Sequence, residues 1–408
     1  MTPRRLDALR TLRDFPRYLT AGGLANAGVA WLWNASPLLI TLAVARQGNL
    51  PEAAVVSWLA AAHVVGGVLS ITLGLYYRQP IVGAYTIPGV VLVGGALTHL
   101  PFEQIVGAYW FVGILIVLLG ATGLVRRVIA QLPFPIMMGM VAGVLLPFAL
   151  AVIRGLQQAP VLSSLPIVAF AMVTVVPGLR RIPPVLAALI AGLLGATWLG
   201  QADWAALSVE LARPQFVTPM FSAAAAAELV IPLVLMVVAV QNVQGYAALR
   251  AAGYEPPLSG LTVAAGIGTL VSALAGSPPA SIAGPSTAIV SAPSSGPSEN
   301  RHTASMVLGV LWIVTGLLAP AAAALTRIVP RALVDVLAGL ALLPALAQFF
   351  HQAFGGRFRF GALTAFLVTV SGLVLFRVSA PFWALVAGMG ASMVLDRADA
   401  RDPADHPG

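Results

Sequence analysis

The stretches PIVGAYTIPGVVLVGGALTHL (residues 80–100) and SPPASIAGPSTAIVSAPSSG (residues 277–296) decide how this chain folds. Each contains a proline, then several small residues, and then a second proline, Pro88 or Pro285, that opens a short apolar run. Proline lacks an N–H and disfavours helix in the residue before it, yet it fits the first turn of a new helix. The pattern therefore predicts that both stretches are interrupted, with a short helix beginning near each of these prolines.

The composition predicts that lipid surrounds the chain. Of its 408 residues, 59% are apolar and 9% are charged, with a mean hydropathy of +0.92. A water-soluble domain carries about 25% charged residues, so this chain has too few to cover a surface in water. The net charge of +8 does not indicate a nucleic-acid partner, because the arginines are scattered between apolar runs. Without cysteines or clustered histidines, no metal and no cofactor is expected.

A window of roughly 20 apolar residues predicts an all-α polytopic membrane protein with about fourteen transmembrane segments. Twelve or thirteen transmembrane segments are the alternatives. The predicted segments are residues 18–44, 53–75, 81–98, 103–121, 132–152, 161–177, 184–199, 225–249, 258–276, 279–295, 304–320, 330–350, 361–376 and 379–395. Residues 1–17 are interpreted as a cytoplasmic tail rather than a signal peptide, because the apolar run that follows continues past Leu42. Residues 396–408 form the second tail.

Arginine placement predicts the orientation, because cytoplasmic loops are enriched in positive charge. With the N-terminus inside, sixteen of the 22 arginines fall on the inner side. The six on the outer side are Arg46, Arg154, Arg213, Arg327, Arg331 and Arg377. Both termini are therefore expected to be cytoplasmic.

The two halves of the chain look alike. VAGVLLPFAL at 141–150 returns as LAGLALLPAL at 337–346, at nearly the offset that separates Pro88 from Pro285. The pattern predicts a first repeat at 18–200, a connecting segment at 201–224 and a second repeat at 225–395. Seven spans is an odd number, so the second copy inserts upside down, as in the inverted repeats of alternating-access carriers.

The paired interruptions predict an anion site inside the bilayer. Each helix start presents free N–H groups and about half a positive charge, and two starts facing each other make an anion site without a basic side chain. The expected site residues are Tyr85, Thr86, Pro88, Gly89, Gly284, Pro285, Ser286 and Thr287, with Trp33 and Asn34 from the first span and Gln241 and Asn242 from the eighth. The alternatives are ordinary proline kinks and, for the amides, hydrogen bonds between packed helices.

Three ionisable residues within spans are candidates for proton coupling, because such residues are costly in a membrane and usually functional. They are Glu228, Asp335 and His63. Both carboxylates lie near predicted span ends, where snorkelling or a partner such as Arg331 would suffice. The alternative for His63 is a packing role.

With these residues in place, the chain resembles the benzoate/proton symporter family of bacterial inner-membrane carriers. SWLAAAHVVGGVLSITLGLYYRQPIVGAYTIPGVVLV (57–93) looks like the second and third spans of that family. IPLVLMVVAVQNVQGYAALRAAGYEPP (231–257) is similar to its eighth span, and SIAGPSTAIVSAP (281–293) continues the match.

The resemblance implies a seven-plus-seven inverted-repeat fold shared with nucleobase and sulfate carriers, in which a core domain moves against a gate domain. It further implies uptake of benzoate or a related aromatic acid with a proton. In the nucleobase relatives a carboxylate in the eighth span contacts the substrate, and Gln241 occupies the similar position here. In GPSTAIVSAP (284–293), the proline and the serines differ from the plainer run of small residues that the resemblance implies for the tenth span.

We therefore expect a proton-coupled secondary transporter of a small organic anion, and not an enzyme. The rivals are a carrier of a nucleobase or an inorganic anion on the same fold, and a passive anion channel. An integral membrane enzyme would require acidic or histidine clusters that the sequence lacks. Whether the carrier forms a homodimer is left open.

Overall fold

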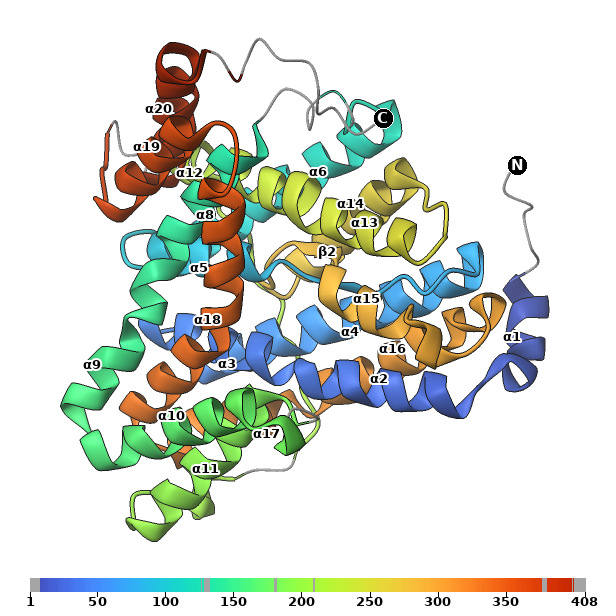
Figure 1. Ribbon diagram of the computed structural model, residues 1–408, viewed down its shortest axis with the longest axis horizontal. Coiled ribbons are helices and arrows are strands. Elements are labelled where there is room, and N and C mark those ends of the chain that lie inside the picture. Colours follow the sequence, from blue (N-terminus) through green and yellow to red (C-terminus); the bar gives the residue numbers. More distant parts are fainter. Residues whose placement is uncertain are drawn as a thin grey trace.

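The computed structural model describes residues 8–125, 127, 133–179, 182–207, 210–375, 380–397 and 399, and these are mostly helical (Figure 1). The helices before the midpoint are α1 (Ala8–Tyr18), α2 (Ala21–Trp33), α3 (Ala35–Gln47), α4 (Glu52–Tyr77), α5 (Ile87–Ala96), α6 (Phe102–Thr122), α8 (Phe134–Ala149), α9 (Ala151–Gln158), α10 (Pro160–Val175) and α11 (Pro184–Trp198). Those after it are α12 (Ala223–Leu235), the π-helical η3 (Met236–Gln241), α13 (Asn242–Ala251), α14 (Leu258–Ala273), α15 (Gly284–Val290), α16 (His302–Leu317), α17 (Ala319–Ile328), α18 (Arg331–Phe354), α19 (Arg359–Val370) and α20 (Ala380–Leu395). Short 3₁₀ turns are η1 (Pro177–Leu179), η2 (Trp204–Ala206), η4 (Pro293–Ser295) and η5 (Ser298–Asn300).

Most of the two predicted tails lies outside this range. Residues 1–7, 398 and 400–408 are not among the described residues, and neither are Arg126, Arg180, Arg181 and Arg377 of the orientation argument. Within the first tail, α1 forms a separate helix before the first long apolar helix pair.

Six helical stretches among the described residues are long and apolar enough to cross a bilayer by themselves. They are Ala21–Gln47, Glu52–Tyr77, Phe102–Thr122, Phe134–Gln158, Ala223–Ala251 and Arg331–Phe354. The stretch Ser298–Leu317 joins α17 at a bend of 56° and makes a seventh when the pair is taken as one span. Further predicted segments coincide with shorter apolar helices: α5, α10, α11, α14, α19 and α20.

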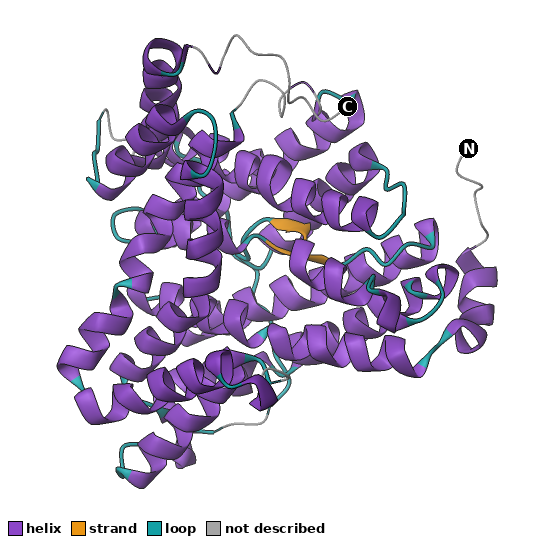
Figure 2. Cartoon of the chain, in the orientation of Figure 1, coloured by secondary structure: helices purple, strands orange, loops and turns teal. Residues whose placement is uncertain are grey.

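The all-α prediction missed a pair of short strands, which Figure 2 shows in the middle of the molecule. β1 (Gly83–Tyr85) pairs with β2 (Ala280–Ile282) in antiparallel register, with Ala84 opposite Ser281. Beyond the strands, the Thr86 N–H donates to the Pro279 carbonyl at 2.9 Å. Buried backbone N–H and C=O groups need hydrogen-bond partners because no water reaches them. Pairing the two interrupted stretches supplies those partners.

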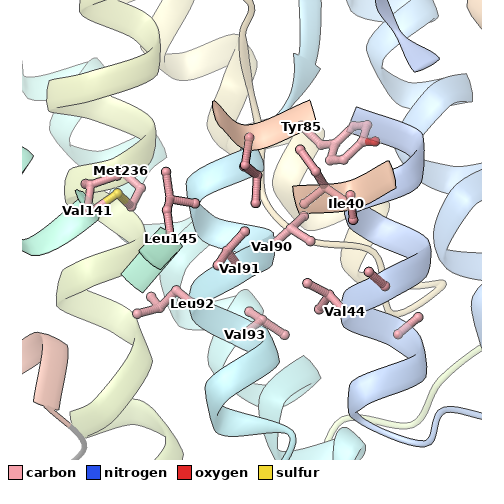
Figure 3. Close-up of a cluster of buried hydrophobic side chains, with 14 of the residues drawn as sticks. Ile40, Val44, Tyr85, Val90, Val91, Leu92, Val93, Val141, Leu145 and Met236 are labelled. Carbon is pink, nitrogen blue, oxygen red and sulfur yellow. The ribbon is translucent and has the colours of Figure 1, made fainter. Parts of the chain in front are cut away.

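A short helix begins directly after each strand. α5 begins at Ile87, with Pro88 in its first turn, and α15 begins at Gly284, with Pro285 in its first turn. α5 is enclosed by apolar side chains: Figure 3 shows its valines between Ile40 and Val44 of α3 on one side and Val141 and Leu145 of α8 on the other. These packing partners come from sequence positions far apart, so α5 is held at the centre of the fold.

The helices pack in two groups. The strand-bearing group comprises α2–α6, β1, β2 and α12–α17, and its most extensive packing is between α4 and α16 and between α6 and α14. The flanking group comprises α8–α11 and α18–α20, in which α8 packs against α18 and α19, and α10 against α11. Small residues permit the close approach, as at Gly67 and Gly309, where an added Cβ would collide with the opposite backbone.

Candidate substrate-binding site

A cavity of about 490 Å³ lies between the two helix groups. The strand-bearing group contributes Leu32, Trp33, Asn34, Ser36, Pro37, Ile40, Ala62, His63, Ala84, Tyr85, Ile87, Pro88, Gln241, Gln244, Ala283, Pro285, Ser286 and Trp312. The flanking group contributes Leu145, Phe170, Val185, Ala341, Leu342, Pro344, Ala345, Gln348 and Phe349, and Pro183 and Pro184 come from the start of α11. Most of this lining is apolar or aromatic, with a few neutral polar groups among it, as is typical of small-molecule sites.

Asn34, His63 and Tyr85 form one polar wall of the cavity. Asn34 Nδ2 lies 2.9 Å from His63 Nε2, and His63 Nδ1 lies 2.8 Å from the Leu59 carbonyl oxygen. Since the amide nitrogen donates and a carbonyl only accepts, this arrangement fits a neutral imidazole with its proton on Nδ1. The Tyr85 ring stands edge-on to the His63 ring at 5.6 Å, and its hydroxyl lies 3.2 Å from Thr41 Oγ1.

The adjacent amides Gln241 and Asn242 have different neighbours. Gln241 ends the π-helical turn η3 and lines the cavity. Asn242 is fully buried, and its Oδ1 accepts a hydrogen bond from the Ile282 N–H of β2 at 2.9 Å. Neighbouring residues on a helix project about 100° apart, so one amide faces the cavity while the other holds the strand.

The predicted site residues therefore divide into lining and supporting positions. Trp33, Asn34, Tyr85, Pro88, Gln241, Pro285 and Ser286 line the cavity, as does the coupling candidate His63. Thr86, Gly89, Asn242, Gly284 and Thr287 do not line it but hold the strands and the helix starts.

The supporting contacts are specific. Thr86 Oγ1 accepts from the Gly89 N–H at 3.2 Å and so caps α5. Thr287 Oγ1 accepts from the Val82 N–H at 3.3 Å, across the two interrupted stretches. At Gly284, an added Cβ would lie 2.7 Å from Gln244 Cβ, so only glycine lets α15 pack this close to α13.

The sequence interpretation missed many lining residues, among them two amides, Gln244 and Gln348, and three aromatics, Trp312, Phe170 and Phe349. A signal existed for Gln244, which lies one helical turn after Gln241 and so shares its face. Gln348 lies one turn after Pro344, which belongs to the repeated stretch LAGLALLPAL (337–346). No comparable signal marks Phe170 or Trp312, because apolar aromatics are common throughout such spans.

The two carboxylate candidates lie away from the cavity lining. Arg331 Nε is 3.6 Å from Asp335 Oδ2, which confirms the partner suggested for that carboxylate. Glu228 is 1% exposed and pairs instead with His99, with 3.0 Å between Oε2 and Nε2. His99 was not predictable as a partner of Glu228, because it follows α5 and is 129 residues away in the sequence.

No arginine, aspartate or glutamate is among the described residues that line the cavity. The lining includes Pro88 and Pro285 from the first turns of α5 and α15, and the first turn of a helix carries unpaired N–H groups and about half a positive charge. The cap position of α15 is Ala283, which makes no side-chain cap hydrogen bond. The part of the chain that the structure describes also holds no group of three or more acidic or histidine side chains suited to a metal ion.

Residues 16–394 match the family model of the benzoate membrane transport protein. The chain belongs to this family. It is accordingly a multi-pass membrane transport protein and not an enzyme. Among curated relatives, the benzoate membrane transport protein of Acinetobacter baylyi (strain ATCC 33305 / BD413 / ADP1) is 30% identical over 393 residues, 95% of this chain and 98% of that protein. The inner membrane protein YdcO of Escherichia coli (strain K12) is 33% identical over 384 residues, 93% of this chain and 96% of that protein.

Solved structures show that this benzoate transport family member shares its fold with other carriers. The transmembrane domain of the cyanobacterium bicarbonate transporter BicA matches with a TM-score of 0.57 at 18% identity, covering 91% of this chain and 97% of that domain. Murine Slc26a9, an anion transporter in the inward-facing state, matches with a TM-score of 0.64 at 13% identity, covering 95% of this chain and 70% of that chain.

Proposed function

We propose that this chain takes up benzoate, or a related aromatic carboxylate, together with protons across the bacterial inner membrane by alternating access. The observation that carries the proposal is the cavity between the two helix groups. Its lining combines aromatic side chains, neutral hydrogen-bonding groups and the starts of two helices, and it contains no charged acid that would repel an anion. Membership of the benzoate transport family supports the choice of substrate.

In the proposed binding mode the carboxylate lies toward the start of α15. Ser286 and Gln241 are within the lining there and supply donors, and the uncapped first turn of α15 supplies backbone N–H groups. The ring then packs against aromatic side chains from both helix groups, among them Trp312, Phe170 and Phe349. A hydrated inorganic anion would gain nothing from these aromatic surfaces, which favours an aromatic acid over sulfate-like substrates.

The coupled proton is proposed to lie between the substrate and the His63–Asn34 pair. Neutral His63 accepts from the Asn34 amide nitrogen in the present arrangement. If the amide turns over, its oxygen accepts instead and the imidazole holds a second proton. A carboxylate in the cavity would stabilise that proton, and its charge would be neutralised for the crossing. Glu228 and Asp335 stay the alternative proton carriers.

The proposed mechanism assigns the strand-bearing group to the moving core and the flanking group to the gate, in a topology of fourteen spans arranged as two inverted repeats of seven. The cavity includes the first residues of α11 and the second half of α18. With the arginine-based orientation, these ends are placed on the cytoplasmic side together with both termini, and the proposed mechanism therefore assigns an inward-facing state to this arrangement.

Proteoliposomes test the proposal. With the lumen alkaline relative to the outside, radiolabelled benzoate should accumulate above its external concentration, and a protonophore should abolish the accumulation. Equilibration without accumulation would indicate a passive anion channel. Competition with unlabelled uracil or sulfate, at the concentration where unlabelled benzoate competes, would indicate the nucleobase or inorganic-anion rival. Absence of benzoate flux above empty liposomes would overturn the proposal.

A further inference from the structure

Three arginines gather around one carboxylate where α3, α9 and α18 meet. Arg331 Nε lies 3.6 Å from Asp335 Oδ2 on α18. Asp335 also interacts electrostatically with Arg46, in the last turn of α3, and with Arg154 of α9. Arg46 and Arg331 in turn repel each other. We call these four residues the arginine junction. Its positive charges exceed its negative charge by two.

The arginine junction contains a hydrogen-bond donor that has no acceptor. Arg46 Nη1 is buried and has no hydrogen-bond partner. Arg154, which is exposed, donates to the Pro147 carbonyl, a neutral acceptor. A buried, charged donor without a partner is unfavourable, and a guanidinium is suited to a carboxylate or another oxyanion because its N–H groups bind two oxygens side by side.

The arginine junction is separated from the central cavity by packed apolar residues. On α3, Arg46 lies six residues beyond the lining residue Ile40, which is about 9 Å along the helix. On α18, Asp335 precedes the lining residue Ala341 by the same spacing. The intervening residues 41–45 and 336–340 are all buried. We call these two buried segments, residues 41–45 and 336–340, the plug. Because α3 belongs to the strand-bearing group and α18 to the flanking group, the plug separates the cavity from the arginine junction.

We propose that the arginine junction is a second anion-binding site, which takes a carboxylate or a comparable oxyanion. The anion would supply the missing acceptor for Arg46 and balance the excess charge. The same chemistry describes a free anion and the phosphate of a phospholipid headgroup. The site lies on the far side of the plug, so an anion arriving from that face meets it before the cavity. This capture role rests on the proposed function, whereas the binding itself does not.

Thermal unfolding of the purified protein in a neutral detergent tests the binding, with sodium phosphate titrated at constant ionic strength. We expect a saturable rise of Tm in the wild-type protein and in Gln241→Ala, whose substitution lies in the cavity. Arg46→Gln should weaken the apparent phosphate affinity at least tenfold, and Arg46→Lys should weaken it less. Arg213→Gln, which removes an exposed arginine elsewhere, should leave it unchanged.

Asp335→Asn separates an anion site from a merely structural ion pair. Removing the competing carboxylate should tighten phosphate binding several-fold, whereas a structural role predicts weaker binding. A rise of Tm that requires added phosphatidylglycerol and Arg46 would identify a lipid headgroup as the occupant. No rise with phosphate or with phosphatidylglycerol, or equal phosphate-induced rises in wild type and Arg46→Gln, would overturn the proposal. Loss of benzoate uptake with this binding intact would contradict only the proposed function.

Discussion

The interrupted stretches 80–100 and 277–296 share a sequence pattern and pair through their strands, yet they differ chemically. α5 has 10 residues, begins with a threonine cap and is enclosed by the core (Figure 3). α15 has 7 residues, begins without a side-chain cap and is followed by the polar turns η4 and η5. The first stretch contributes only apolar side chains from its helix start, Ile87 and Pro88, whereas the second contributes Ser286.

The difference indicates a division of labour within an approximate repeat. In the first stretch, Thr86 satisfies the helix start internally, so α5 serves as framework. In the second, the start of α15 has no side-chain cap and packs closely against the neighbouring α13, and the proposed binding mode assigns its N–H donors to the substrate. Sequence symmetry thus predicts where helices begin, but not which of the two start sites binds substrate.

Gly284→Ala is expected to have the largest effect. Its Cβ would collide with the α13 backbone and side chain around Gln244, which would displace the start of α15. Benzoate uptake should fall to less than about a tenth of wild type, because misplacement by roughly 1 Å costs on the order of 100-fold in a positioned site. Gly95→Ala, in α5, has no heavy atom within 4 Å of the new Cβ and is the matched control. Similar uptake by both variants would contradict the comparison.

His63→Gln tests whether the β1 side of the cavity carries the coupled proton. Glutamine keeps polar contacts with Asn34 but does not titrate, so benzoate should equilibrate without accumulating under a pH gradient. Glu228→Gln, which alters the only buried carboxylate of α12, should still accumulate benzoate. Accumulation by His63→Gln, together with its loss in Glu228→Gln, would indicate that the His99–Glu228 pair carries the coupled proton.

Gln241→Ala and Asn242→Ala separate ligand contact from support of β2. Gln241→Ala should raise the KM for benzoate about tenfold with little change in Tm, since a hydrogen bond to a charged group contributes about 1.5–3 kcal/mol. Asn242→Ala leaves the Ile282 N–H without its partner and should lower the free energy of unfolding by about 1–3 kcal/mol. Thermal unfolding and uptake kinetics on both variants check this assignment; the reverse pattern would refute it.

The smallest effects are expected from single substitutions at the starts of α5 and α15. Thr86→Val removes the cap of α5 and should cost about 1 kcal/mol of stability while leaving KM within about twofold. Ser286→Ala should raise KM a few-fold, because one donor to the carboxylate is lost, and should leave Tm unchanged. Equal behaviour of the two variants in both measurements would show that the starts are equivalent.

Much of the helical framework was predictable because its causes are local. Apolar runs and flanking prolines placed α4, α6 and α18 within a few residues, and Pro88 and Pro285 marked two helix starts. The pairing of β1 with β2 was not predictable, since each strand satisfies its backbone with a partner almost 200 residues away. The π-helical turn η3 also left no clear local signal in an apolar run.

The candidate site was predictable where polar residues stand out against apolar spans, as at Asn34, Gln241 and Ser286. Its aromatic lining was not, because Phe170 and Phe349 resemble lipid-facing residues until the helix packing is known. The same reason hid the His99–Glu228 pair, whose members lie on separate elements. The environment of these aromatic and ionisable residues depends on contacts between distant segments, which the residue type alone does not reveal.

The most direct test of the central claim is the position of a heavy-atom substrate in crystals soaked with 4-iodobenzoate. The proposed binding mode places an anomalous iodine peak inside the cavity on the side of Phe170 and Phe349, with the carboxylate toward Ser286 and Gln241. An iodine peak against the start of α15, with the carboxylate among the flanking helices, would contradict the account, as would occupancy confined to positions outside the cavity.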